Sequence, residues 1–402
     1  MTYHNAVKYL QQLPLESTDS SALPLLWEAL DSPQRNLKYL RFTGSNGKTV
    51  CAELLLSAFE RSEHTVGSLS LPVQNDGKRN IRINALPLPP EEFASYVERI
   101  VHALKAICAE SSEDANASLS QSELLLSVAL LAFREHRCSF CVIESDASAT
   151  DPTRRLPAPF AAAICGTIPA EHQKELQQIR SYIVHGIQEI VSAPQNQNAY
   201  RLISETCAAV NCRLTIPTKT ELKIERLSLS GNEFSYKNEK YKLALCGKFQ
   251  VTNATVVLEL ISMLARHGFP LEQAQIAEGL RQTKLPAKFE IISVSPTIVV
   301  DSTHSETAVE VVCESLADFQ PILGDKLHLC LPSGALEEQY LHALTLHDFA
   351  IDSITIYEKE TNLKEMIASL LPKLSKADVL LVSGHCDQTL HIRDEILKKL
   401  HK

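Results

Sequence analysis

The sequence predicts an α/β protein in which a large N-terminal domain with a central, mostly parallel sheet precedes a smaller α/β C-terminal domain. Three observations support this fold class. Apolar segments typical of strands alternate with segments of helical periodicity, as in parallel sheets covered by helices. A glycine-rich loop separates a predicted strand from a predicted helix near residue 45. The alternation restarts after a break near residues 286–297, so we expect two domains, 1–287 and 288–402.

The N-terminal elements are expected in an order that suits a parallel sheet. Two short helices come first, at residues 2–13 and 21–33, because apolar residues recur there at helical spacing. A Pro-Pro-Glu-Glu helix start follows at residues 89–92. The other elements predicted for this region are the strand 37–43, helix 50–62, strand 64–71, helix 123–136 and strands 138–145 and 160–167.

The pattern changes between residues 218 and 245, where polar and apolar residues alternate around Gly-Asn and Asn-Glu turns and predict hairpins. Helices are expected next, at 253–270 and 271–283. Strand and helix then alternate again, with strands predicted at the start of 297–319 and within 326–334, 353–358 and 377–386.

Composition and charge limit the classes of function. A hydrophobic content of 45% and a charged content of 22% are ordinary for a soluble globular protein. The net charge of −9 argues against general binding to nucleic acid or anionic membranes, although local basic residues can still hold small anions. No apolar run is long enough to span a membrane, and residues 1–14 lack the pattern of a signal peptide. The eleven cysteines lack zinc-site spacing, and we expect a cytoplasmic protein.

The loop between the strand 37–43 and the helix 50–62 predicts a phosphate site. Glycines let backbone amides approach an anion closely, and a helix N-terminus adds unpaired N–H groups and a favourable dipole. Lys48 is expected to reach the outer phosphates of a nucleotide, and Thr49 to bind Mg²⁺ directly or through water. The predicted ATP-binding residues of this loop are Gly44, Ser45, Asn46, Gly47, Lys48 and Thr49.

Several segments resemble, in the expected order, the folylpolyglutamate synthase/dihydrofolate synthase branch of the Mur ligase superfamily. The loop "TGSNGKT" is similar to that branch's "TGTNGKT", and "NIRINALPLPPEEF" to its "RIRINGEPISEEEF". "GKFQVTNATVVLEL" resembles its helix "G-x-HQ-x-x-NA", and "LPAKFEII…TIVVDSTHSETA" its junction "PGRFE…DGAHNPEA". The resemblance spans nearly the whole chain. It implies an N-terminal domain that contains a phosphate-binding P-loop and a Rossmann-like C-terminal domain.

The resemblance implies ATP-dependent amide ligation. A carboxylate takes the γ-phosphoryl group of ATP, and an amine, commonly the α-amine of glutamate, attacks the acyl phosphate. This chemistry requires cradled phosphates, a divalent cation such as Mg²⁺ and two positioned substrates. The implied partners are a pterin- or folate-like carboxylate and an amino acid, bound by a monomer that uses neither nucleic acid nor membrane.

The resemblance also implies a metal site. Glu144 ends a predicted strand and matches an acidic metal ligand of the family, and His172 in "IPAEH" matches a metal-binding histidine. Together with Thr49 they form the expected metal site. The expected catalytic residues are Lys48, Glu144, His172 and Lys288.

Further ATP-binding residues are implied in the second half of the chain. Asn253 matches an asparagine that contacts the adenine side of ATP. Asp301 and His304 match the aspartate and histidine of "DGAHN", at a strand-to-helix turn of the kind that binds ligands in parallel sheets. The family's Gly-Arg pair appears as Ala287-Lys288, and its asparagine after the histidine as Ser305. Lys288 keeps the positive charge for a phosphate but loses the planar, bidentate fork of arginine.

Other departures concern the acceptor and the second metal ion. The family's "EVGLGGRLDATN" appears as "ESDASATDPTRR", so side chains stand where bare backbone would approach a substrate. Leu71 stands where a metal-loop serine belongs, unless Ser70 replaces it by a shift of one residue. Ile183 stands where the family carbamylates a lysine to orient a second metal ion.

These departures leave two alternatives to a folate ligase. One is a Mur-type ligase that joins a different carboxylate and amine. The other is a catalytically impaired relative that binds nucleotide without ligation, since the nucleotide loop is preserved better than the acceptor loops. Substrate-stimulated release of ADP and phosphate distinguishes these hypotheses.

Overall fold

The computed structural model describes residues 1–15, 22–44, 46–71, 80–110, 119–145, 150–169, 172–303, 305–320, 323, 326–358 and 360–400. The chain forms two compact units, one made of Met1–Pro217 with Val256–Gly279 and the other of Thr218–Thr255 with Leu280–Lys402. These units do not coincide with the predicted domains, because the hairpin segment groups with the C-terminal sheet. The division at residues 287 and 288 stays a prediction about domains.

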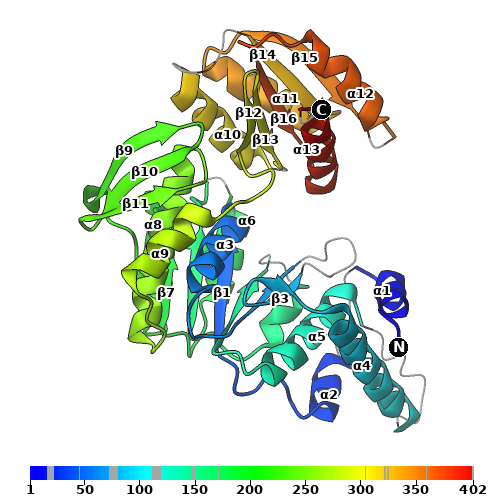
Figure 1. Ribbon diagram of the computed structural model, residues 1–402. Helices are drawn as coiled ribbons and strands as arrows, with labels where there is room; N and C mark the ends of the chain where they lie inside the picture. The colour runs from blue at the N-terminus through cyan, green and yellow to red at the C-terminus, as the bar shows by residue number, and fades with distance from the viewer. Residues whose placement is uncertain are drawn as a thin grey trace. The chain divides into compact units, whose positions relative to one another are not determined.

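The first unit is built on an eight-stranded sheet in the order β4-β3-β2-β5-β1-β6-β7-β8 (Figure 1). The pairs among β2, β5, β1, β6, β7 and β8 are parallel, and β3 and β4 are antiparallel additions at one edge. The predicted fold class is confirmed for this region. The strands are β1 (Tyr39–Gly44), β2 (Val66–Ser70), β3 (Ile81–Ile83), β4 (Leu86–Pro87), β5 (Phe140–Glu144), β6 (Ala161–Cys165), β7 (Glu189–Ser192) and β8 (Arg213–Thr215).

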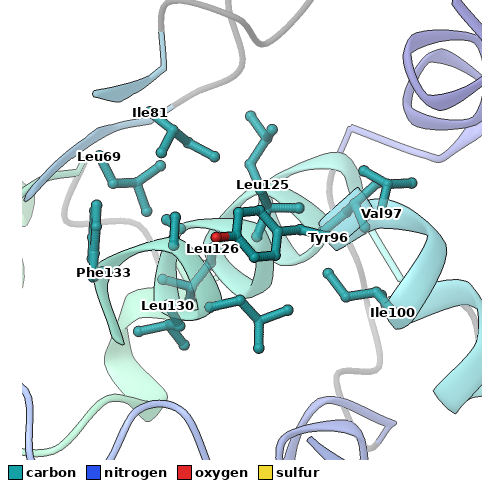
Figure 2. Packing of buried hydrophobic residues seen from close by; sticks show 14 of the residues in the cluster. Leu69, Ile81, Tyr96, Val97, Ile100, Leu125, Leu126, Leu130 and Phe133 are labelled. Atoms are coloured by element: carbon teal, nitrogen blue, oxygen red, sulfur yellow. The ribbon is translucent and has the colours of Figure 1, made fainter. Parts of the chain in front are cut away.

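Helices pack on this sheet to form its cores. They are α1 (Tyr3–Gln12), α2 (Ala22–Ala29), α3 (Lys48–Phe59), α4 (Pro90–Glu110), α5 (Gln121–Glu135), α6 (Gln173–Tyr182) and α7 (Gln197–Ala209), with a short 3₁₀ turn, η1 (Pro152–Arg155). Figure 2 shows part of one core, where Leu69 and Ile81 of the sheet lie near α5 side chains such as Leu126 and Phe133. A second core joins α6 and α7 to β6 and β7.

Helix α5 illustrates why the sequence folds locally as it does. Ser120 and Glu123 form a capping box, in which each side chain pairs with the other residue's backbone N–H. Every residue from Leu124 to Phe133 is buried, as expected for a helix that is apolar on all sides. Glu123 is therefore part of the helix start.

The second unit contains two sheets. A three-stranded antiparallel sheet, in the order β11-β10-β9, confirms the predicted hairpins. A five-stranded sheet has the order β12-β13-β16-β14-β15, with β12 antiparallel and the other pairs parallel. The strands are β9 (Leu222–Ser228), β10 (Gly231–Tyr236), β11 (Glu239–Leu243), β12 (Glu290–Val294), β13 (Thr297–Asp301), β14 (Leu327–Pro332), β15 (Ile351–Tyr357) and β16 (Val379–Ser383).

Helices cover both faces of the five-stranded sheet. Val299 faces a core with α10 and α11, whereas its neighbours Ile298 and Val300 face a core with α12 and α13. This arrangement is the α/β sandwich expected from the alternation of strands and helices. The helices are α10 (Glu306–Phe319), α11 (Ala335–Leu346), α12 (Leu363–Leu370) and α13 (Cys386–Leu400).

The first boundary between the two units lies between Pro217 and Thr218, and the other two fall within α8 (Lys248–Arg266) and α9 (Gln273–Gln282). Helix α8 begins five residues before the predicted start at residue 253, so Asn253 lies inside the helix. Among the described residues, no helix is both long and apolar enough to cross a membrane.

Candidate nucleotide and metal site

The glycine-rich loop connects β1 directly to α3, as predicted (Figure 1). Gly44 has φ 123° and Gly47, the N-cap of α3, has φ 80°, a region that favours glycine. A Cβ atom on Gly44 would lie 2.0 Å from the carbonyl oxygen of Cys165 on the neighbouring strand. One on Gly166 would lie 2.7 Å from the carbonyl oxygen of Asn46, so the loop packs tightly against the end of β6. Ser45 lies outside the described residues.

Lys48 opens α3 and folds back over this loop. Its Nζ donates a hydrogen bond to the carbonyl oxygen of Gly44, at 2.8 Å. The ammonium group therefore lies at the loop itself, next to the N-terminus of the helix, where an anion is favoured. The roles of Lys48 and of the loop backbone in binding ATP stay predictions.

Glu144 and Thr49 are brought together from residues 95 apart in the sequence. The Thr49 hydroxyl donates a hydrogen bond to Oε1 of Glu144, and the Ser70 hydroxyl donates to Oε2, at 3.2 Å. Burial raises the pKa of the Glu144 carboxyl, while the two hydroxyl donors and the charge of Lys48 act in the opposite direction. Glu144 is therefore a buried carboxyl group that accepts hydrogen bonds from two hydroxyl groups.

The structure supports the one-residue shift that makes Ser70 the hydroxyl residue of this strand. Ser70 is the register partner of Glu144 in the parallel pair of β2 and β5. Leu71 is 7% exposed and belongs to the hydrophobic core with Leu69 and Ile81. Ser70 was not among the residues expected to bind the metal ion. Its spacing of two residues from Ser68, and of four from Val66, places these side chains on one face of the strand and is the sequence pattern that could have identified it.

His172 is not joined to Thr49 and Glu144 by any contact that the structure shows. It is the N-cap of α6, and its Nδ1 lies 3.3 Å from Oε2 of Glu175. Over the described parts of the chain, no three His, Cys, Asp or Glu side chains are close enough to hold a metal ion. The role of His172 stays a prediction, and its neighbour Glu171 lies outside the described residues.

Ile183 follows α6 and is 6% exposed in the core that α6 and α7 form with the sheet. Its side chain packs with Ile179 and Ile187 and offers no metal ligand. The isoleucine at this position therefore packs in a hydrophobic core, where the resemblance had implied a lysine.

The chemistry of the donors suits Mg²⁺. Glu144 offers carboxylate oxygens, and Thr49 and Ser70 offer hydroxyl oxygens, which are the ligand types that Mg²⁺ prefers. Because Mg²⁺ usually keeps several waters and phosphate oxygens, a single carboxylate from the protein is sufficient in nucleotide sites. The residues present therefore fit a magnesium ion.

In the second unit, Asn253 and Lys288 are linked through Gln250. The amide of Asn253 donates to Oε1 of Gln250, at 3.0 Å, and the amide of Gln250 donates to the carbonyl oxygen of Lys288, at 3.4 Å. Both amide residues are buried on α8. Because α8 begins at Lys248, Gln250 and Asn253 lie three residues apart on one face of the helix. The predicted start at residue 253 left Gln250 outside the helix.

The turn at Ala287 and Lys288 has an unusual backbone. Ala287 and Phe289 both have φ 53°, in the left-handed region that favours glycine. The family's glycine at the position of Ala287 is explained by this conformation. The turn is held by hydrogen bonds from the Ala287 N–H to Glu290 and from the Ser302 N–H to the Ala287 carbonyl, at 2.9 and 2.8 Å.

Asp301 supports the same turn. Its Oδ2 accepts a hydrogen bond from the Phe289 N–H, at 2.7 Å, and its Oδ1 accepts one from the Thr303 hydroxyl. Ser305 is the N-cap of α10, since its hydroxyl accepts a hydrogen bond from the Ala308 N–H. These contacts give Asp301 and Ser305 structural roles, and ATP binding by Asp301 stays a prediction. His304 lies outside the described residues.

Comparison with known proteins finds similar sequences and structures. No protein-family model matches the chain. The chain is 23% identical over 340 residues to folylpolyglutamate synthase of Lacticaseibacillus casei, which covers 80% of this chain and 78% of that relative. It is 20% identical over 306 residues to dihydrofolate synthase/folylpolyglutamate synthase of Bacillus subtilis, covering 72% of this chain and 70% of the relative.

The solved FPGS–AMPPCP–folate complex has the same fold. It superposes with a TM-score of 0.80 at 19% identity and covers 98% of this chain and 99% of its own. The match extends over both units of the chain and agrees with the order of the motifs in the sequence. The chain is therefore similar in sequence to folylpolyglutamate synthases and dihydrofolate synthases, and it shares the fold of the solved FPGS complex.

Proposed function

We propose that the protein is an ATP-dependent ligase that forms an amide bond between a folate-like carboxylate and glutamate or a similar amino acid. The observation that carries this proposal is the meeting of Thr49 and Glu144 beside the glycine-rich loop. It occurs in a chain whose fold matches the FPGS–AMPPCP–folate complex over nearly its full length. Nucleotide binding and folate binding are thus properties of a protein of the same fold.

The nucleotide half of the reaction rests on the first unit. The loop amides and the N-terminus of α3 are suited to the phosphates of ATP, and Lys48 would offset the charge that develops on the outer phosphate. Thr49, Glu144 and Ser70 would hold Mg²⁺, which supplies further charge neutralisation when bound. Asn253, Lys288, Asp301 and His304 are proposed as further ATP-binding residues, and His172 is proposed to contribute to metal binding.

The proposed ligation proceeds in two balanced steps. A carboxylate oxygen of the acceptor attacks the γ-phosphorus, which forms an acyl phosphate and releases ADP. The amine nitrogen then attacks the acyl carbon, phosphate leaves as the amide bond forms, and the nitrogen releases a proton to solvent. Lys48 and Lys288 are the proposed cationic residues for the phosphoryl oxygens.

We also propose a monomer that works in the cytoplasm with Mg²⁺ as its metal ion. Mg²⁺ is supported by the oxygen ligands around Glu144. The cytoplasmic location is supported by eleven free cysteines, eight of them buried, which suit a reducing compartment. Sedimentation of the purified chain tests the monomer.

The test is the release of ADP and phosphate by purified protein with Mg²⁺ and ATP. Dihydropteroate or tetrahydrofolate and glutamate are added singly and together, and the product is weighed by mass spectrometry. We expect turnover that requires both substrates and a product heavier by one glutamyl residue. Nucleotide binding without substrate-stimulated turnover would contradict folate ligation, and a screen of other carboxylates and amines would then test for a different acceptor.

A lysine variant separates the nucleotide site from the rest of the proposal. Lys48→Ala removes the ammonium group beside Gly44 and should weaken ATP binding by roughly a hundredfold, as expected for loss of a charged phosphate contact. Arg61→Ala on the protein surface is the matched control. Unchanged ATP affinity in Lys48→Ala would rule out the glycine-rich loop as the nucleotide site.

A further inference from the structure

A cluster of charged and aromatic side chains lies beside Ser145, the residue that follows Glu144. We refer to this cluster as the clamp. Its members come from β1, from the η1 turn and from the end of α6, and they are Arg41, Asp151, Thr153, Arg154 and Tyr182.

The ring of Tyr182 is contacted by two cations. The guanidinium carbon of Arg41 lies 4.7 Å from the ring centre, and that of Arg154 lies 4.6 Å from it. Contacts at this range are favourable because the face of an aromatic ring is electronegative. The ring therefore joins β1 to η1 through two guanidinium groups.

Hydrogen bonds connect the same elements. The Tyr182 hydroxyl donates to Oδ2 of Asp151, and burial together with the Asp151 charge raises the pKa of Tyr182, so the donor stays protonated. Asp151 also accepts hydrogen bonds from the N–H and the hydroxyl of Thr153, at 2.9 and 2.8 Å. Arg41 in turn donates to the Thr153 carbonyl, at 2.7 Å. Three separate elements are thus tied to one another.

The clamp reaches Glu144 through the next residue. The hydroxyl of Ser145 lies 3.3 Å from that of Thr153, within hydrogen-bonding distance, and Ser145 is fully buried. Its N–H donates to the carbonyl of Phe42 on β1, at 3.5 Å. Thr49 and Ser70 donate hydrogen bonds to the side chain of Glu144. The next residue in the chain, Ser145, contacts the clamp.

A contribution to stability does not by itself explain why an arginine is buried at position 41 of β1. A central strand of a parallel sheet normally carries apolar residues, yet this arginine is 5% exposed. Within the described residues, its Nε has no hydrogen-bond partner. Replacing buried ionic groups by apolar residues is often neutral or stabilising, so a buried cluster of this kind is weak evidence for a stabilising role. What the cluster does provide is a defined position for Ser145, the residue that follows β5.

We propose that the clamp positions Glu144 for metal binding by fixing the chain on the C-terminal side of this residue. Arg41, Arg154 and Tyr182 act through Ser145 and are positioning residues, not ligands. The inference rests on the proposed function, since it assigns the purpose of the clamp to the metal site of a nucleotide-binding protein.

The first test is the magnesium requirement of nucleotide binding. Tyr182→Phe removes the hydroxyl but keeps the ring, and Arg154→Gln removes one cation from the ring. We expect both variants to need about tenfold more Mg²⁺ for half-maximal binding of a fluorescent ATP analogue, as when outer partners of a metal ligand are removed. At saturating Mg²⁺ the affinity for the analogue should return to that of the unaltered protein. Arg155→Gln, an exposed neighbour outside the clamp, is the matched control and should leave the requirement unchanged.

The second test does not depend on nucleotide binding. Amide hydrogen exchange of peptides covering 140–145 and 150–156 should be faster in Tyr182→Phe and Arg154→Gln than in Arg155→Gln. Melting temperatures equal to that of the control would show that this exchange reflects local loosening and not global unfolding.

The two measurements separate the inference from the proposed function. If the unaltered protein binds no Mg²⁺-nucleotide, the proposed function fails, and hydrogen exchange still decides whether the clamp holds the segment after Glu144. If the clamp variants match Arg155→Gln in both exchange and magnesium requirement, the clamp has no positioning role. Faster exchange with an unchanged magnesium requirement would also overturn the inference, because the clamp would then order the segment without affecting Glu144.

Discussion

The two turns that carry the expected nucleotide-binding residues hold an unusual backbone in different ways. The loop after β1 uses Gly44 and Gly47 at positive φ, with values of 123° and 80°. The turn before β12 uses Ala287 and Phe289, each with φ 53°. A Cβ on Gly44 would lie 2.0 Å from a backbone oxygen, whereas Ala287 carries a Cβ and is fully buried.

This difference shows which glycines a divergent chain can lose. A left-handed backbone costs a residue other than glycine about 1 kcal/mol, which the hydrogen bonds around Ala287 can offset. A clash with the backbone of a neighbouring strand cannot be offset without moving that strand. The nucleotide loop is therefore the more constrained of the two turns.

The largest expected effect is that of Gly44→Ala. Because the new methyl group would overlap the Cys165 carbonyl, we expect a loss of about 4 kcal/mol in the free energy of unfolding and loss of nucleotide binding. Gly268→Ala is the control, since Gly268 also has positive φ but no heavy atom would lie within 4 Å of its Cβ. Its expected cost is about 1 kcal/mol. Equal costs in urea titrations of the two variants would show that the backbone clash is irrelevant.

The buried carboxyl groups beside the two turns are expected to affect thermal stability in opposite directions. Burial raises the pKa of Glu144 above its ordinary value of 4.5, so the unfolded chain loses this proton at lower pH than the folded chain. Stability then falls as pH rises through 4.5 towards the folded value. Ligand-free Glu144→Gln should therefore melt at a higher temperature than the unaltered protein at about pH 8, and the difference should vanish in acid. Its magnesium-dependent nucleotide binding should fall by about a hundredfold.

Asp301→Asn is the matched variant for Glu144→Gln. Asp301 accepts hydrogen bonds from the Phe289 N–H and the Thr303 hydroxyl, so its amide replacement should lower stability by about 1–2 kcal/mol. Opposite signs of the two melting shifts at neutral pH are expected. If ligand-free Glu144→Gln is instead less stable than the unaltered protein, the hydrogen bonds to ionised Glu144 and the charge of Lys48 stabilise this carboxylate by more than burial destabilises it.

A third, smaller effect is expected where alanine has replaced the family's glycine. Ala287→Gly should raise the free energy of unfolding by roughly 1 kcal/mol, because it relieves the left-handed conformation of a residue with a side chain. Ala368→Gly, at an exposed position of α12 in the same unit, should lower stability by about 1 kcal/mol instead. Destabilisation by both substitutions, measured in urea, would mean that the Ala287 methyl group contributes more by packing than it costs in strain.

The smallest expected effect concerns the N-cap of α10. Ser305→Ala removes the hydroxyl that accepts the Ala308 N–H and should cost about 1 kcal/mol. Ser305→Asn restores the family's residue and should change stability by less than about 0.5 kcal/mol, because asparagine and serine are similar N-caps. A large gain in ligand affinity for Ser305→Asn would show that the family's asparagine does more than cap the helix.

The sequence by itself determined the fold class and the place of the glycine-rich loop between a strand and a helix. The alternation of strands and helices and the Gly-x-x-Gly-Lys-Thr pattern between β1 and α3 are local properties, because they follow from side-chain periodicity and from the backbone freedom of glycine. The predicted strand also placed Glu144 at its end, and the resemblance of motifs added the expectation that Glu144 binds a metal ion. These predictions required no knowledge of which strands are neighbours.

Only the tertiary structure decided which residues surround the predicted ones. The register of β2 against β5 selected Ser70 over Leu71, and the pairing of η1 with α6 assembled the clamp around Tyr182. The sequence predicts ATP binding by Asp301, and the structure adds that its carboxyl oxygens support a turn within the protein. Such contacts join residues far apart in the sequence. They depend on strand register and helix placement, which the packing of the whole unit sets and no local pattern encodes.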